Sequence, residues 1–189
     1  MSHTDIYTGF ARIRKGVKTA GVFLFLFLAS FHIKAQTVAA RAYQVKAVFL
    51  YNFSQFVEWP PTAFSSSSAP FVIGILGNDP FGSYIDETVA GENMMGHPMV
   101  VQRYHTVKDI TDCHILFINT GDDMAQVLTA LGNRSILTVS DDKNFAKKGG
   151  MIRFFTVNNK VRLRINLSSA KAANLTISSK LLRLAEIVD

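Results

Sequence analysis

The stretch that most constrains the fold is residues 41–61, which has the pattern of one long amphipathic helix with an abrupt end. Its apolar side chains recur at steps of three and four residues, the spacing that places them on one face of a helix. The predicted buried face consists of Val45, Val48, Phe49, Asn52, Phe53, Phe56 and Val57. Pro60 and Pro61 cannot continue a helix, and the residue before a proline is displaced from helical geometry. We therefore expect a helix of about 17 residues that packs along one small domain and ends near Trp59.

Three side chains at the end of this helix need an explanation beyond packing. Asn52 falls on the predicted apolar face, and Glu58 and Trp59 follow at the helix end. A buried amide needs a hydrogen-bond partner. Either these residues lock the helix end from inside or they form part of a binding surface, and the pattern leaves both interpretations open.

Residues 1–35 have the layout of a secretory signal peptide, so the predicted folded domain is residues 36–189. Basic residues between Arg12 and Lys18 precede an apolar run over residues 20–31, and Ala35 suits the end of a cleavage site. This run is shorter than the roughly 20 apolar residues that span a membrane, which makes an uncleaved anchor the weaker alternative. We predict an exported protein, and the lack of a cysteine just after the run argues against a lipoprotein.

Removal of this segment changes the charge of the chain. The full sequence has a net charge of +6, whereas residues 36–189 carry 15 basic and 13 acidic side chains, a net charge of +2. Nucleic-acid binding needs a concentrated basic surface. We therefore expect no nucleic-acid partner.

The rest of the chain alternates short apolar runs with helical segments, which favours an α/β fold. Strands are predicted over residues 70–77, 99–104, 114–119 and 135–140. Helical segments are predicted from Asp79 to Val89, over 107–111, from Asp122 or Asp123 to Leu131, over 141–148, over 168–173 and over 178–187, with a loop at 91–98. Asn158-Asn159 between two further strands indicates a hairpin over 151–166. The predicted fold is a single-domain α/β sandwich with a mostly parallel central sheet, a C-terminal antiparallel hairpin and helices on both faces.

The second arm of this hairpin alternates apolar and basic side chains, so its outward face is positively charged. Arg153 on the first arm and Lys160, Arg162 and Arg164 on the second arm form this face. It is either a solvated sheet edge that discourages strand pairing or a surface for an acidic partner. Arg162 and Arg164 are therefore candidate partner-binding residues.

A ligand loop is the alternative candidate site. Gly77, Asp79 and Phe81 follow the first strand, at the sheet edge where α/β proteins hold ligands. This loop lacks the packed glycines of a nucleotide site, and Asp79 would repel a phosphate. We predict no cofactor.

Catalytic and metal-binding patterns are not evident in the sequence. His97, His105 and His114 do not have the spacing of metal ligands; His114 suits the edge of the core, and the other two suit surface loops. The pairs Asp122-Asp123 and Asp141-Asp142 are explained as helix caps. No nucleophile–base set is evident, so we predict a binding or regulatory protein and not an enzyme, with a secreted hydrolase as the weakest alternative.

Cys113 is the only cysteine, which excludes an internal disulfide. It precedes an apolar run, so a buried, unreactive thiol is expected. Intermolecular pairing is the alternative.

Three long motifs and one short motif of the chain resemble those of the YfiR family. They are residues 43–60, 136–152, 164–166 and 177–185. The first contains Asn52, Phe53, Phe56, Glu58 and Trp59, which the resemblance marks as motif residues and candidate partner-binding residues.

This resemblance implies a periplasmic α/β protein without catalysis that binds the periplasmic domain of an inner-membrane diguanylate cyclase and holds it inactive. It also implies that an OmpA-like outer-membrane lipoprotein can sequester the inhibitor. Related domains accompany sensor kinases, so a kinase is an alternative partner, and a small-ligand sensor is an alternative function. A homodimer remains open. The best-known member carries disulfides, which a chain with Cys113 alone cannot form internally.

Overall fold

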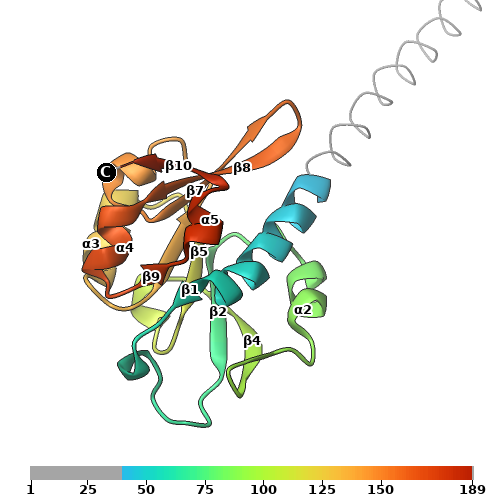
Figure 1. The fold of residues 1–189 in the computed structure, drawn as a ribbon, viewed down its shortest axis with the longest axis vertical. Coiled ribbons are helices and arrows are strands. Elements are labelled where there is room, and N and C mark those ends of the chain that lie inside the picture. Colours follow the sequence, from blue (N-terminus) through green and yellow to red (C-terminus); the bar gives the residue numbers. More distant parts are fainter. Residues whose placement is uncertain (1–39, 189) are drawn as a thin grey trace, which may run out of the picture. The chain divides into compact units, whose positions relative to one another are not determined.

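The computed structural model describes residues 40–188 (Figure 1). Residues 42–189 form one compact unit, which contains the sheet with its helices. The predicted signal peptide over residues 1–35 lies outside the described residues. Within those residues, no helix is both long and apolar enough to cross a lipid bilayer.

The opening helix runs over residues 40–56, as the periodicity predicts, but its buried face differs from the predicted one. Ala47, Leu50 and Phe53 are fully buried, whereas Val45 is 45% exposed and Val48 is 39% exposed. Apolar residues surround most of this helix, so two stripes fit the helical period equally well. The buried stripe includes Ala47, whose short side chain allows close approach to the sheet.

The chain leaves the helix before the prolines, as predicted. Strand β1 (Val57–Glu58) pairs antiparallel with β9 (Thr176–Ile177), and the N–H of Ser178 donates to the carbonyl of Phe56 at 2.8 Å. Pro61 then opens the short 3₁₀ helix η1 (Pro61–Ala63). The end of the helix is therefore tied to a segment about 120 residues later in the chain.

The central sheet contains the predicted parallel core and the predicted hairpin. Its strand order is β10-β8-β7-β6-β5-β2-β4-β3. The strands are β2 (Phe71–Gly77), β3 (Asn93–Met94), β4 (His97–Tyr104), β5 (Ile115–Asn119), β6 (Leu137–Ser140), β7 (Ile152–Val157), β8 (Lys160–Asn166) and β10 (Ala185–Val188). Pairing is parallel except for β7 with β8 and β3 with β4. The β7–β8 turn places Asn158 and Asn159 at φ 49° and 59°, which is the geometry that tight hairpins require.

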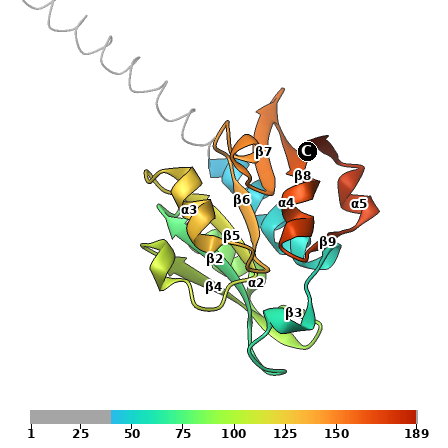
Figure 2. The same ribbon diagram turned by 90° about the vertical axis from the view of Figure 1, so that its left-hand side faces the viewer.

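Helices cover both faces of this sheet, as predicted (Figures 1 and 2). The opening helix and α2 (Ser83–Val89) pack on one face, where Phe53, Ile85 and Phe117 belong to one core. Helix α3 (Met124–Leu131) packs on the other face with Leu116 and Phe145. Asp123 caps α3 and Gly132 ends it, which confirms that prediction.

Three local predictions are wrong. Helix α2 begins at Ser83 and not after Asp79, because Asp79 Oδ1 accepts the N–H groups of Phe81 and Gly82 in a turn before the helix. Residues 91–98 are not a loop throughout, because they include β3, the turn after it and the first two residues of β4. The helix predicted over 141–148 is reduced to η3 (Ala146–Lys148), while η2 (Val107–Asp109) occurs where a helical turn is expected.

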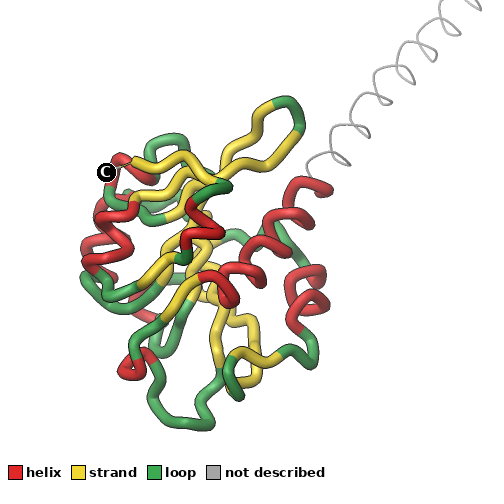
Figure 3. The backbone as a smooth tube through the Cα atoms, in the orientation of Figure 1, coloured by secondary structure: helices red, strands yellow, loops and turns green. Residues whose placement is uncertain are grey.

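The predicted closing helix over 178–187 is also wrong. Helix α4 (Leu167–Ala172) is followed by β9, then by α5 (Ser179–Leu182), and the chain ends in β10 beside β8 (Figure 3). The side of β8 that does not face β7 has backbone N–H and C=O groups that need partners. Residues 185–188 pair with these groups as a parallel strand and do not continue the helix. β10 pairs with β8 only over residues 163–166, so Lys160 and Arg162 lie on a part of β8 that extends beyond this neighbour, and both interpretations of the basic face stay open.

The sheet packs so closely at Gly74 that a methyl group cannot be added without movement. A Cβ there would lie 2.7 Å from Cε2 of Tyr104 and 2.8 Å from Sγ of Cys113. We expect Gly74→Ala to lower the free energy of unfolding by about 1–3 kcal/mol through overpacking. Gly121→Ala, where a Cβ meets nothing within 4 Å, is the matched control and should change it by less than about 0.5 kcal/mol. Urea unfolding followed by Trp59 fluorescence compares them, and equal stabilities would contradict the packing.

Candidate functional site

The candidate residues fall into three separate parts of the fold. Phe53 is fully buried and Phe56 half-buried in the core, while Asn52 is half-buried and not on the innermost stripe. Glu58 and Trp59 lie at the exit of the opening helix. Arg162 and Arg164 lie on β8, and the ligand-loop residues Gly77, Asp79 and Phe81 lie at the end of β2. The candidates therefore do not form one site.

Trp59 is anchored in the fold by both its ring and its indole nitrogen. Nε1 donates to the carbonyl of His114 at 3.2 Å, and the ring meets that of Phe71 edge-on at 5.0 Å. Val57 before it is buried, whereas Glu58 is exposed. The hydrogen bond from Trp59 to His114 thus fixes the helix end from inside, which is the first of the two interpretations of this motif.

A stack of aromatic rings continues from Trp59 toward β4. Phe64 lies 4.0 Å from the ring of His97 and 4.5 Å from that of His114, measured between ring centroids. His97 Nδ1 lies 2.6 Å from the carbonyl oxygen of Ala69. His97 is thus a half-buried residue of β4, and our assignment of it to a surface loop is wrong. These contacts position the segment between Trp59 and β2 against the sheet.

His114 is held in its neutral form by its surroundings. The N–H of Val72 donates to Nδ1 at 3.1 Å, so in the neutral ring the proton lies on Nε2, which is buried without a hydrogen-bond partner of good geometry. Burial, and secondarily the proximity of His97, lower the pKa of His114 to about 4, against the opposing effects of Asp112 and the Ala63 backbone. His114 is therefore a buried residue, as a place in the core requires, but only one of its two ring nitrogens has a hydrogen-bond partner among the described residues.

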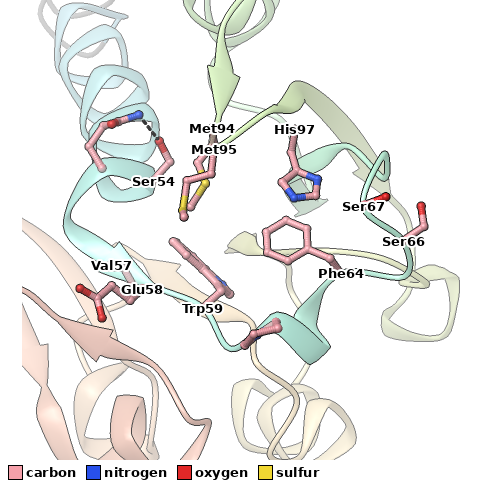
Figure 4. A pocket seen from close by; sticks show the side chains of 12 residues that line it. Ser54, Val57, Glu58, Trp59, Phe64, Ser66, Ser67, Met94, Met95 and His97 are labelled. Carbon is pink, nitrogen blue, oxygen red and sulfur yellow. Dashed lines mark hydrogen bonds between the residues drawn. The ribbon is translucent and has the colours of Figure 1, made fainter.

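An apolar groove of about 710 Å³ opens beside Trp59 (Figure 4). We call it the Trp59 groove. It is lined by the end of the opening helix, the segment after it and the β3–β4 hairpin, through Ser54, Gln55, Val57, Glu58, Trp59, Pro61, Phe64, Ser66, Ser67, Met94, Met95 and His97. Met95 at the hairpin turn is 89% exposed, with a positive φ of 51°, whereas Met94 is buried. The groove thus has an apolar floor and a polar rim, the composition of a binding surface.

The ligand loop, in contrast, is closed by its own hydrogen bonds. The N–H of Asn78 donates to the Asn119 carbonyl at 2.9 Å, and Asn119 Nδ2 donates to the Asn78 carbonyl at 3.0 Å. Asp79 accepts a 2.8 Å hydrogen bond from Arg103, and Phe81 is buried against Tyr43 and Phe117. A Cβ on Gly77 would lie 2.3 Å from the Asn119 carbonyl oxygen, so glycine is required for this approach. The polar groups of the loop are therefore engaged within the protein.

Lys46, Tyr43 and Asp141 form a polar cluster that our sequence analysis missed. Lys46 Nζ lies 2.6 Å from Asp141 Oδ2 and 4.0 Å from the centroid of the Tyr43 ring, and the Tyr43 hydroxyl donates to the same oxygen at 2.9 Å. Burial and the hydrogen bond to Asp141 raise the pKa of Tyr43 to about 12. Asp141 is thus an ion-pair partner and not a helix cap, which corrects that prediction. The three-residue spacing of Tyr43 and Lys46 was the available signal.

No arrangement with catalytic geometry emerges from residues 40–188. Nowhere in that range do three or more histidine, cysteine, aspartate or glutamate side chains gather as metal ligands would. Cys113 is buried, and its desolvation raises the pKa of the thiol to about 12, as expected for an unreactive cysteine. The groove offers contact area and hydrogen-bonding groups, which suit binding.

A family model described as YfiR/HmsC-like matches residues 43–186. The chain belongs to the YfiR/HmsC-like family. No curated protein matches the sequence. Membership indicates a periplasmic regulator of diguanylate cyclase signalling, a regulatory protein rather than an enzyme.

The motifs that carry the family resemblance meet in the structure. Residues 43–60 contact residues 136–152 through the Lys46–Asp141 ion pair, and contact residues 177–185 through the β1–β9 pairing. These motifs are far apart in the sequence. Their shared role is to hold the opening helix and the Trp59 segment in place on the sheet.

The ion pair provides a test of that role. We expect Asp141→Asn to lower the free energy of unfolding by about 2 kcal/mol, because Lys46 is only 7% exposed and loses its counter-charge. The double variant Lys46→Met with Asp141→Asn should be more stable than Asp141→Asn alone. A double-mutant cycle in urea measures this coupling, and additive effects would show that the two side chains act independently.

The lowered pKa of His114 leads us to expect a loss of stability in mild acid. Its folded pKa of about 4 lies below the ordinary value of 6.5, so between these values the unfolded chain binds a proton that the native protein lacks. The free energy of unfolding should therefore fall as the pH falls from 6.5 to 4, by at most about 3 kcal/mol from this group. His114→Asn keeps an acceptor for the N–H of Val72 but cannot titrate. Urea unfolding across this range should give a flatter profile for the variant, and identical profiles would refute the role of His114.

Proposed function

We propose that the chain is an exported periplasmic inhibitor that binds the periplasmic domain of an inner-membrane diguanylate cyclase. The family match over residues 43–186 is the observation that carries this proposal. In this account residues 1–35 are removed as a signal peptide and residues 36–189 form the inhibitor. Cyclic di-GMP in the cytoplasm would then be controlled by contact between proteins, without a catalytic step in this chain.

The Trp59 groove is the surface that we propose for the cyclase. Met95 exposes an apolar side chain at its rim, and an apolar groove with a flexible methionine suits the repacking that occurs when a partner docks. Glu58 adds an exposed carboxylate beside it. Trp59 then has two roles: its indole nitrogen secures the fold, while one part of the ring lines the contact surface.

An OmpA-like outer-membrane lipoprotein that competes for the same inhibitor fits this scheme. A lipoprotein that covered the groove would release the cyclase. A sensor kinase is the alternative membrane partner, and it would leave cyclic di-GMP unchanged when the chain is deleted. The level of cyclic di-GMP in a deletion strain therefore separates the two partners.

The exposed rim of the groove allows the partner surface to be tested without disturbing the core. In a strain that lacks this chain, we expect raised cyclic di-GMP and stronger biofilm formation, both restored by the wild-type protein. Met95→Glu should fold normally but fail to restore repression, because it replaces an exposed apolar side chain of the rim with a charged one. Val45→Glu is the matched control, since Val45 is also exposed but does not line the groove. Full repression by Met95→Glu would exclude the groove as the partner surface.

A small-ligand sensor is the second candidate function. The groove volume of about 710 Å³ lies in the range of small-molecule sites, and its lining is mostly apolar. A ligand that binds only the native state raises the melting temperature. Thermal-shift screening against periplasmic metabolites would support this function if a hit were lost in Met95→Glu and kept in Val45→Glu.

A further inference from the structure

The charges of the chain are separated along the sheet. Residues 143–188 carry ten basic side chains and one acidic side chain, Glu186, whereas residues 40–142 carry five basic and eleven acidic side chains. The first set includes β7, β8 and β10 at one end of the sheet, and the second includes β2, β4 and β3 at the other. A small net charge therefore conceals a strongly cationic end.

The cations at this end are concentrated on one face of the β7–β8 hairpin, which we call the cationic face. Three cross-strand pairs build it, Arg153 with Arg164, Phe155 with Arg162, and Val157 with Lys160. Phe154, Leu163 and Ile165 alternate with them and belong to the core on the opposite face. The tip of the hairpin extends beyond the neighbouring strands (Figure 1).

The positive charges of this face are not matched within the described part of the chain. Arg164 lies 2.5 Å from Glu186, but Arg153, Lys160 and Arg162 form no ion pair there. Arg153 and Arg164 are direct cross-strand neighbours, and like charges in that position repel. Nε of Arg153 is buried without a hydrogen-bond partner. A face with these properties gains from contact with an anionic surface.

Apolar groups are interleaved with these cations. The centroid of the Phe155 ring lies 5.5 Å from Cζ of Arg153 and 5.1 Å from Cζ of Arg164. Val157 at the tip is 47% exposed. A bilayer surface offers both anionic headgroups and an apolar boundary just below them, which matches this composition.

In the part of the chain that the structure describes, the cationic face does not line a cavity that could hold the side chains of a peptide. None of the four cavities described within residues 40–188 is lined by its six residues. β7 pairs with β6 only through Ile152 and Arg153, and β8 pairs with β10 only through residues 163–166, so the outer part of the hairpin extends beyond both neighbours and presents its side chains to an approaching surface. We infer that the cationic face of the β7–β8 hairpin docks on the anionic surface of a phospholipid bilayer. This inference does not depend on the cyclase as partner.

Co-sedimentation of the exported protein with vesicles tests this inference. We expect binding to vesicles with about 30% phosphatidylglycerol and no binding to pure phosphatidylcholine, because the attraction is electrostatic. The binding should weaken strongly between about 0.05 M and 0.5 M salt, where screening shortens the range of the attraction. No binding to phosphatidylglycerol at low salt, or equal binding to both vesicles, would overturn the inference.

Paired variants locate the surface. Lys160→Gln with Arg162→Gln should weaken binding about 25-fold, since each cation near an anionic surface contributes about fivefold. Lys108→Gln with Lys171→Gln is the control, because it changes the net charge equally at exposed sites away from the cationic face. Lys108 lies in η2, and Lys171 lies in α4, which follows the end of β8 farthest from the hairpin turn. Equal losses in both variants would exclude this face as the docking surface.

Two controls complete the experiment. Circular dichroism melting should be unchanged in both variants, and if the hairpin variant is unstable, Lys160→Gln alone should still weaken binding about fivefold. Heparin serves as a soluble polyanion. Binding to heparin without binding to phosphatidylglycerol vesicles would indicate an acidic macromolecule as the ligand and would refute the bilayer.

Discussion

The architecture depends on how the opening helix is held against the sheet. Ala47, Leu50 and Phe53 bury one stripe of the helix, and the exit strand β1 pairs with β9. The β1–β9 pairing joins segments that are about 120 residues apart, so local sequence does not determine it. The position of Trp59, and with it the groove, follows from these two attachments, because Trp59 comes directly after β1 and donates to the His114 carbonyl.

Local features of the fold could be predicted from the sequence, whereas features set by distant neighbours could not. Continuous apolar runs indicated the parallel strands, and Asn158-Asn159 indicated the hairpin, since both signals act over a few residues. The apolar spacing over residues 178–187 is typical of a helix, but residues 185–188 instead pair with β8 as a parallel strand. The buried stripe of the opening helix could not be predicted either, because two apolar stripes fit the helical period. Which stripe is buried depends on how the helix packs on the sheet.

In the candidate site, too, the local motif could be predicted from the sequence, but the contacts between distant segments could not. The motif singled out Trp59 and Glu58, but the other walls of the groove come from Phe64, the β3–β4 hairpin and His97. Nothing in the sequence brings Met95 beside Trp59, because β3 before it has only two residues and gives no alternating pattern. The Lys46–Asp141 pair spans 95 residues, and its acidic member resembled a helix cap. Two surfaces result, an apolar groove and a cationic hairpin face, on different parts of one domain.

The central claim is that the Trp59 groove is where the membrane partner is bound. Photo-crosslinking in living cells tests it most directly, with a crosslinking amino acid placed at Met95 or, as a control, at Val45, both exposed in the free protein. The account predicts that Met95 captures the periplasmic domain of a membrane diguanylate cyclase and that Val45 does not. Capture of the cyclase from Val45 but not from Met95 would contradict the account, as would the absence of a cyclase adduct at both positions.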